Sequence, residues 1–166
     1  MNLEERFRQT LMTQGWQFRS LDPADLVPRL REFLSSDGPG VAGGNRARRA
    51  CTEAGLPLVD RPDQEPAWGV VDATFGIADP GSVVLRIAPD LPRWLPLLPP
   101  RLVVLLRAED LLADLDAFWQ TPGVRTASWL FLHGPSVTAD IEKVLVHGVH
   151  GPAEVHLWLL RNAGNA

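Results

Sequence analysis

The spacing of apolar residues predicts helices in the first part of the chain. Leu3, Phe7 and Leu11 are four positions apart, as on one face of a helix, and Gly15 is a plausible stop. Asp22 is suited to cap a second helix. The predicted helices span residues 2–14, the segment from Asp22 to Leu34, and the segment from Arg46 to Glu53. Residues 1–66 are therefore expected to be mainly helical.

Strand-length apolar runs dominate from Trp68 onward. They lie at residues 69–71, 74–78, 82–87, 102–106, 129–132 and 155–160, and a shorter run precedes them at 56–59. The turn Asp79-Pro80-Gly81 joins the second and third of these runs, which predicts a hairpin.

Two further helices are predicted between the later strands, from Glu109 to Trp119 and from Thr138 to Val146. The run at 102–106 is apolar throughout, which is typical of a strand covered on both faces. Strands that alternate with helices indicate an α/β fold with an open, mostly parallel sheet. The hairpin is expected to make that sheet mixed.

The chain length of 166 residues fits a single domain. Within it, residues 1–66 form the helical part and residues 67–161 the α/β core, joined by a polar, proline-rich loop at 60–67. A hydrophobic content of 45% with 22% charged residues is typical of a folded globular chain.

Charge and hydropathy narrow the classes of partner. The net charge of −4 gives no overall positive field to attract nucleic acid or an anionic membrane. The N-terminus lacks the apolar segment of a secretory signal, and the apolar run at 102–106 is far too short to span a bilayer. We expect a cytoplasmic protein.

Cys51 is the single cysteine. This count excludes a disulfide within the chain and an iron–sulfur cluster held by this chain alone, because such a cluster takes four cysteine ligands as a rule. We expect neither a cofactor nor a metal, and Cys51 is interpreted as a small helix residue.

Three sequence blocks resemble motifs of the lactate-utilisation domain family, in that family's order. The first two are Gly76-Ile77-Ala78-Asp79-Pro80-Gly81-Ser82 and Leu97-Leu98-Pro99-Pro100. The third begins Gly134-Pro135-Ser136-Val137-Thr138-Ala139-Asp140-Ile141-Glu142 and ends Gly148-Val149-His150-Gly151-Pro152 before an apolar strand. The resemblance covers roughly residues 68–160.

The resemblance implies a three-layer α/β/α fold similar to the sheets of sugar-phosphate isomerases and CoA-transferases. Members of the family serve in bacterial oxidation of L-lactate to pyruvate. There, a small protein without a cluster acts with a cysteine-rich partner and a partner that holds iron–sulfur clusters. With its single cysteine, this chain is similar to the small, cluster-free member.

Two positions depart from the family pattern. Val137 stands where the family has an arginine, which removes a cation and weakens an anion-binding role. Asp79 and Pro80 replace a glutamate and a threonine. Both changes favour a divergent paralogue whose substrate is not lactate.

The predicted turn after His133 suggests a ligand site. A helix that begins near Thr138 would present free N–H groups to an anion, here a small carboxylate or a phosphate. The hypothesised ligand-binding residues are Gly134, Ser136, Thr138, Asp140 and His150. In the alternative interpretation, Ser136 or Thr138 only caps the helix.

Other side chains have weaker patterns. Asp79 is a candidate catalytic nucleophile by similarity to CoA-transferases, although the pattern favours an ordinary Asp-Pro-Gly turn. His147 and His150 have a spacing seen in metal pairs but lack a third ligand of matching spacing. His156, inside an apolar strand, is interpreted as a structural histidine with satisfied hydrogen bonds.

Three functions remain open from the sequence. The chain is a subunit or ligand-binding component of a lactate-type oxidation system, an independent small-molecule enzyme similar to CoA-transferases or isomerases, or a regulatory ligand sensor. The fold alone does not choose among them.

Overall fold

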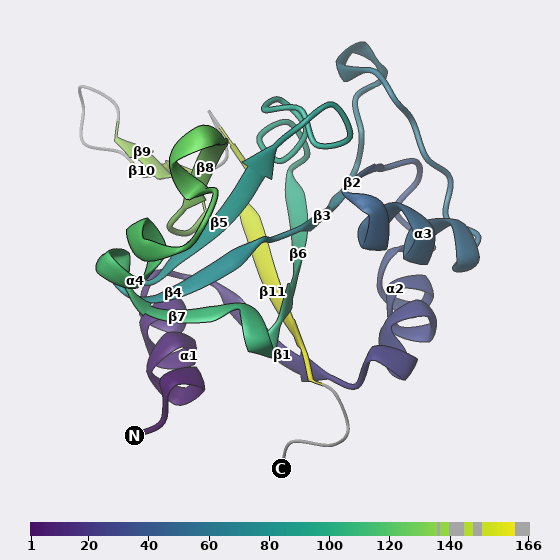
Figure 1. Ribbon diagram of the computed structural model, residues 1–166. Helices are drawn as coiled ribbons and strands as arrows, with labels where there is room; N and C mark the ends of the chain where they lie inside the picture. Colours follow the sequence, from purple (N-terminus) through teal and green to yellow (C-terminus); the bar gives the residue numbers. More distant parts are fainter. Residues whose placement is uncertain (136, 140–144, 148–150, 162–166) are drawn as a thin grey trace.

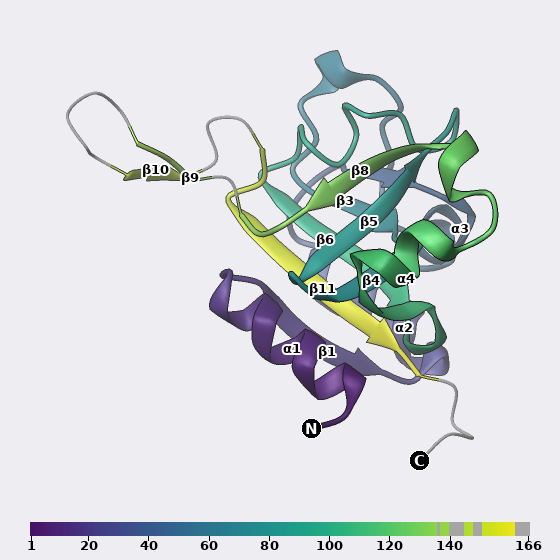
Figure 2. The ribbon, with the colours of Figure 1, turned by 60° about the vertical axis from the view of Figure 1, so that its left-hand side comes forward.

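The fold is built on a parallel sheet of five strands. The structure, a computed structural model, describes residues 1–135, 137–139, 145–147 and 151–161. The sheet has the order β1-β11-β6-β3-β2, and all its neighbouring strands are parallel (Figures 1 and 2). Its strands are β1 (Gln17–Leu21), β2 (Val41–Gly43), β3 (Gly69–Asp72), β6 (Arg101–Arg107) and β11 (Glu154–Leu160).

The central strand β6 packs on both faces, as its apolar sequence predicts. Leu102, Val104 and Leu106 belong to one hydrophobic core, whereas Val103 and Leu105 belong to another. Successive strand residues point to opposite faces, so a fully apolar strand supplies both cores. The expected α/β class with a mostly parallel sheet is confirmed.

The two faces of the parallel sheet are covered differently. Helices α2 (Leu26–Leu34) and α3 (Asn45–Glu53) pack on one face, and α1 (Leu3–Thr13) packs on the other together with a second sheet (Figure 1). Asn2 caps α1 by accepting a hydrogen bond from the Glu5 amide at 2.8 Å. Asp22 caps a short 3-10 helix, Pro23–Asp25, that leads into α2.

The second sheet has four strands in the order β7-β4-β5-β8. They are β4 (Phe75–Asp79), β5 (Ser82–Ile87), β7 (Leu111–Asp114) and β8 (Ser128–Leu132). The predicted hairpin is confirmed as the antiparallel pair β4–β5. The hairpin belongs to this separate sheet and does not join the parallel one. Val83 and Leu85 pack onto the parallel sheet, whereas Ile77 and Val84 face a third core on the other side of the hairpin.

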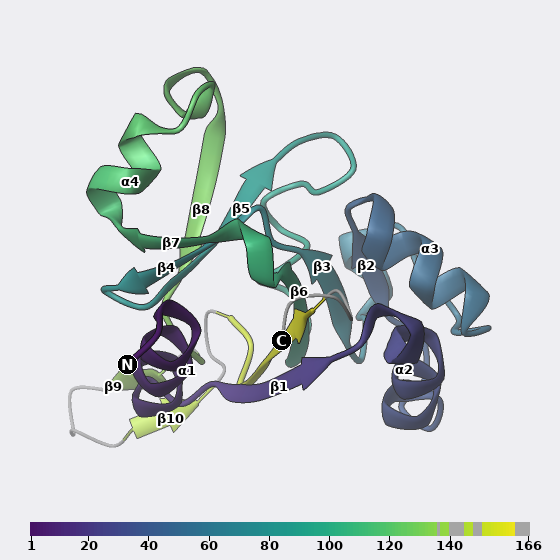
Figure 3. The same cartoon turned by 60° about the horizontal axis from the view of Figure 1, so that its bottom comes forward.

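A fourth helix covers the outer face of the second sheet. This helix, α4 (Leu115–Gln120), follows β7 (Figure 3). Its Phe118 side chain packs among Phe75, Trp129 and Phe131. Three short 3-10 helices complete the described helical elements besides Pro23–Asp25: Pro62–Gln64, Ala108–Asp110 and Val124–Thr126.

Several sequence predictions are wrong in detail. The helix expected from Glu109 to Trp119 is only α4, because Leu111 and Leu112 pair with the edge of β4. Backbone pairing in the tertiary fold overrides helical spacing here. The expected strand at 56–59 is reduced to a single bridge between Leu58 and Gly40. Strands β1 and β2 were not predicted, so residues 1–66 are less purely helical than expected.

The helix expected from Thr138 to Val146 is also wrong. The segment contains the antiparallel strands β9 (Val137–Ala139) and β10 (Leu145–His147). Val137, Thr138 and Val146 are β-branched, and such residues favour strands. Thr138 is therefore part of a strand and does not begin a helix, while residues 140–144 lie outside the described part of the chain.

Gly44 makes the close approach of α3 to β3 possible. It precedes α3 with a φ of 91°, a conformation that L residues with a side chain rarely adopt. A Cβ at this position would lie 2.5 Å from Oδ2 of Asp72. The two Asp72 oxygens accept hydrogen bonds from the amides of Arg46 and Ala47, at 2.8 and 3.0 Å, and so cap α3 from the neighbouring strand.

Within the described part of the chain, no helix combines the length and the apolar character needed to cross a membrane.

Candidate functional site

Two of the segments singled out in the sequence meet at the end of α1, beside the amino end of β1. The Gln14 side-chain amide donates to the Pro80 carbonyl at 2.8 Å, which holds the turn between β4 and β5. Gly134 lies so close that a Cβ on it would be 2.5 Å from the Gln14 carbonyl oxygen. The structure therefore brings the Asp79-Pro80-Gly81 turn and the Gly134-Pro135 turn to one place.

The predicted site residues have different outcomes. Asp79 is exposed at its turn, and its role as a nucleophile stays a prediction. The backbone of Thr138 is in β9, so the helix terminus that was expected to bind an anion is absent there. Ser136, Asp140 and His150 lie outside the described residues, and ligand binding by Gly134 and these residues stays a prediction.

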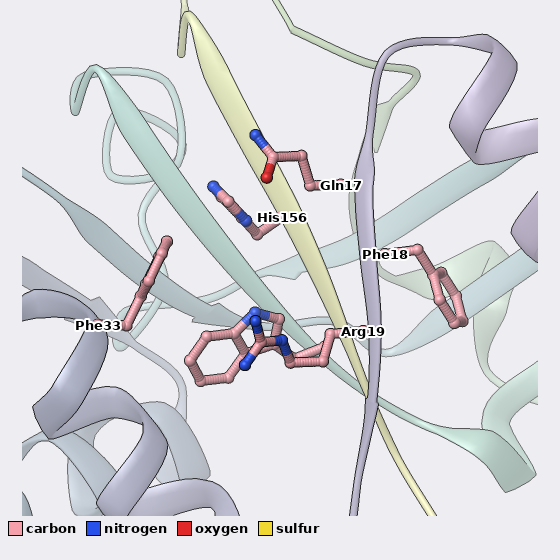
Figure 4. A pocket seen from close by; sticks show the side chains of 6 residues that line it. Gln17, Phe18, Arg19, Phe33 and His156 are labelled. Carbon is pink, nitrogen blue, oxygen red and sulfur yellow. The ribbon is translucent and has the colours of Figure 1, made fainter.

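A small cavity lies on the α2 side of the same region, where β1 and β11 begin. Its volume is about 100 Å³. It is lined by Gln17, Phe18, Arg19, Phe33, His156 and Trp158 (Figure 4). Gln17 is the register partner of His156, and Arg19 is the partner of Trp158, so the two strands place these four residues as adjacent pairs.

Strand periodicity gives the cavity its polar rim and aromatic wall. Gln17 and Arg19 are two residues apart and share one face of β1, whereas Phe18 points to the opposite side (Figure 4). Phe33 of α2 supplies the wall. Its ring centroid lies 4.9 Å from that of His156 and 5.7 Å from that of Trp158.

His156 is hydrogen-bonded to a network of ionic side chains. Its Nε2 donates to Oε1 of Glu154 at 2.5 Å, and Oε2 of Glu154 accepts from Nε of Arg101 at 3.1 Å. Arg101 also pairs with Asp37 through Nη1, and its guanidinium lies 5.2 Å from the Phe33 ring centroid. Both side chains of the Glu154–His156 pair come from the start of β11, at positions i and i+2 on one face.

The electrostatics make His156 neutral at physiological pH. Burial lowers the pKa of His156, and the hydrogen bond to Glu154 only partly opposes that effect. For Glu154, burial acts to raise the pKa, but the hydrogen bonds from His156 and Arg101 outweigh it and the pKa is lowered. Glu154 is thus ionised and only accepts, so Nε2 of His156 carries the proton and Nδ1 is left as an acceptor.

Arg19 supplies a cation at the rim. Its side chain is exposed and has no ion-pair partner among the residues that the structure describes. A guanidinium binds a carboxylate with two parallel hydrogen bonds. The cavity therefore combines a group for a carboxylate, an acceptor for a hydroxyl group and an aromatic wall for a methyl group.

The described residues show no metal centre. Residues 1–135, 137–139, 145–147 and 151–161 contain no group of three or more His, Cys, Asp or Glu side chains placed to hold a metal ion. The Cys51 thiol is fully buried, and burial raises its pKa to about 12.

The sequence pattern did not reveal this cavity. His156 was interpreted as a structural histidine, and its hydrogen bond to Glu154 agrees with that interpretation. Gln17 and Arg19 were missed because β1 was missed. The alternation of apolar and polar residues from Trp16 to Arg19 was the available signal.

Comparison with known proteins gives one relative and one solved structure. The YkgG protein of Escherichia coli (strain K12), whose name describes it as uncharacterized, is 38% identical over 93 residues. That match covers 52% of this chain and 40% of YkgG, so the chain spans less than half of that relative's length.

The solved structure is a DUF162 family protein from Deinococcus radiodurans. It shares the fold with a TM-score of 0.71 at 14% identity, over 95% of this chain and 96% of the other. The family model described as LUD domain matches residues 65–160, which includes β3 to β11 and so most of both sheets. By this match over more than half of its length, the chain belongs to the LUD domain family.

Proposed function

We propose that the protein is a cluster-free component of a lactate-utilisation-type oxidation system and binds a small 2-hydroxy or 2-oxo acid in the cavity at the start of β1 and β11. Membership of the LUD family and the similarity to YkgG suggest a role related to lactate utilisation. The observation that carries the finer proposal is the cavity itself, with Arg19 at its rim and neutral His156 in its wall.

The size of the cavity fits this ligand class. Its volume of about 100 Å³ has room for several water molecules. A three-carbon acid of about six non-hydrogen atoms, such as lactate or pyruvate, fills a space of that order.

The polar groups match the same ligand. The ligand carboxylate pairs with Arg19 and hydrogen-bonds to the Gln17 amide. The 2-hydroxyl group of a hydroxy acid also donates to Nδ1 of His156, whereas a 2-oxo acid binds through its carboxylate alone. The Glu154 carboxylate fixes the tautomer of His156 that makes this possible. Partner proteins that carry iron–sulfur clusters and cysteine-rich motifs would then take the electrons.

Titration calorimetry tests the binding. We expect lactate and pyruvate to bind the wild-type protein, and Arg19→Gln to raise the Kd at least about tenfold through loss of a charge-assisted pair. Arg125→Gln removes the same charge from an exposed position in the 3-10 helix Val124–Thr126 and should leave the Kd unchanged. Equal affinity in the wild type and in Arg19→Gln would reject this cavity as the site.

The choice of acid needs a small panel, because Val137 departs from the family motif. Acetate, lactate, pyruvate and a branched 2-hydroxy acid should be compared at one pH. Tighter binding of the three-carbon acids than of acetate supports a contact with the 2-position. Preference for the branched acid would instead show that the cavity opens to accept a larger side chain.

Affinity purification tests the partner part of the proposal. The tagged chain should be recovered from its native cells grown on lactate and its partners identified by mass spectrometry. Co-purification of an iron–sulfur protein supports a subunit of an oxidation complex. A chain that is recovered alone under mild conditions would contradict that part and leave the ligand-binding part to stand on calorimetry.

A further inference from the structure

The carboxyl edge of the parallel sheet contains a second hollow region, at the opposite end of the strands from the small cavity. Two cavities of about 260 and 360 Å³ lie there and share Arg46 as a lining residue. In open α/β sheets, ligands bind outside the carboxyl ends of the strands.

All five parallel strands contribute to this region. The lining residues are Pro23 after β1, Asn45, Arg46 and Arg49 after β2, Asp72 at the end of β3, Arg107 and Glu109 at the end of β6, and Leu160 at the end of β11. Leu26 of α2 completes it. The region is thus a product of the whole sheet and not of one loop.

The arginines in this region differ in whether an ion pair already occupies them. Arg107 is already paired with Glu109 at 2.7 Å and with Asp110 at 2.6 Å. Arg46 and Arg49 form no ion pair in the part of the chain that the structure describes, although the charge of Arg46 acts on the Asp72 carboxylate. The two arginines lie three residues apart on one face of α3. The amides at the start of α3 are occupied by Asp72, so the two guanidinium groups are the binding groups that remain.

The two cavities differ in chemistry. The larger one is polar and is lined by Asn45, Arg46, Arg49 and Asp72. The smaller one has an apolar side made of Pro23, Leu26 and Leu160, of which the two leucines are buried core residues. Because Arg46 lines both, a ligand with an anionic head and an apolar body can occupy them together.

We propose that the carboxyl edge binds an organic phosphate, with its phosphate between Arg46 and Arg49 and its apolar body against Leu26 and Leu160. The guanidinium groups of Arg46 and Arg49 match the charge of about −1.5 to −2 on a phosphate monoester, whereas a monocarboxylate neutralises only one of them. The combined volume also suits a ligand considerably larger than a three-carbon acid. This site is separate from the proposed small-acid cavity and does not depend on it.

Three probes separate the contributions of head and body. Phenyl phosphate has both, inorganic phosphate has only the head, and benzoate has a similar body with a single charge. In titration calorimetry, phenyl phosphate should bind at least about tenfold tighter than either of the other two. Arg46→Gln and Arg49→Gln should each raise its Kd at least about tenfold, while Arg125→Gln should leave it unchanged.

The outcome is independent of the small-acid site. Arg19→Gln should leave phenyl phosphate binding unchanged, and Arg46→Gln should leave pyruvate binding unchanged. Absence of phenyl phosphate binding, equal binding of phenyl phosphate and inorganic phosphate, or binding that survives the loss of both Arg46 and Arg49 would each overturn the proposal. Failure of pyruvate to bind would affect only the small-acid cavity.

Discussion

Nε2 of His156 and Oε1 of Glu154 are 2.5 Å apart on one face of β11, and this pair lies between the small cavity and the ionic network of Arg101 and Asp37. The pair has two consequences. It orients an imidazole that burial keeps neutral, and the buried imidazole couples the stability of the amino edge to pH.

Stability should fall as the pH is lowered from about 7.5 to 5.5. The pKa of His156 is below its ordinary value of 6.5 in the folded protein, so the unfolded chain takes up the proton first and folding loses free energy as the pH falls through that range. Glu154 has a pKa below its ordinary value of 4.5, so its contribution is lost only at still lower pH. Thermal unfolding across this range measures the effect.

His156→Gln provides the comparison for that titration. Glutamine can still donate a hydrogen bond to Glu154 but does not titrate. The variant should have a flatter dependence of Tm on pH between about 7.5 and 5.5 than the wild type. Parallel curves for the two proteins would show that another group accounts for the pH dependence.

Replacing Arg101 should destabilise the fold. It bridges Asp37 and Glu154 and lies against Phe33. The side chains of Arg101, Asp37 and Glu154 are each only about one-third exposed. Arg101→Gln should lower the free energy of unfolding by about 1–2 kcal/mol in urea titrations. The free energy of unfolding of Arg101→Lys should lie between those of the wild type and Arg101→Gln, because lysine keeps the charge but not the forked donors.

A surface pair gives the control for Arg101. Arg29 and Glu32 form an exposed ion pair on α2, with side-chain exposures of 47% and 71%. Arg29→Gln should change stability by less than about 0.5 kcal/mol. If Arg29→Gln and Arg101→Gln were equally destabilising, the network at the amino edge would have no special role in stability.

Gly44 and Gly55 should respond differently to alanine. Both have positive φ, 91° and 72°, but a Cβ at Gly44 would collide with Asp72 whereas nothing lies within 4 Å at Gly55. Gly55→Ala should cost about 1 kcal/mol from the backbone conformation alone. Gly44→Ala should cost about 2–3 kcal/mol, since it also displaces the cap of α3. Chemical denaturation of the two variants measures these losses of unfolding free energy. Equal losses would contradict the role of Asp72 as the cap of α3.

Cys51 should be unreactive in the folded protein. It is fully buried and its pKa is raised to about 12, chiefly by burial and also by the charge of Asp72. A thiol reagent at pH 8 should modify Cys51 only as fast as the protein unfolds, and modification should be immediate in strong denaturant. Rapid modification under native conditions would show that this side of the core opens readily.

The elements that could be predicted from the sequence are those whose signal lies within a short stretch of the chain. Strand β6 was predicted from five consecutive apolar residues, and the turn at Asp79 predicted the β4–β5 hairpin. Strand β1 was missed because its residues from Gln17 to Ser20 are polar or partly exposed, and only its pairing with β11 makes it a strand.

The small cavity was harder to predict because its residues are brought together only by strand pairing. Arg19 and His156 are 137 positions apart in the sequence, and only the register of β1 on β11 brings them to one cavity. The helix expected after His133 failed because β-branched residues at Val137 and Thr138 favoured a strand pairing that spacing alone does not reveal.

The most direct test of the small-acid cavity is the pKa of His156, measured by NMR with and without pyruvate. A carboxylate bound at Arg19 places a negative charge beside the imidazole, so saturating pyruvate should raise the pKa of His156, and it should not do so in Arg19→Gln. An unchanged pKa of His156 with pyruvate bound would mean that the acid binds elsewhere and would contradict the proposed function.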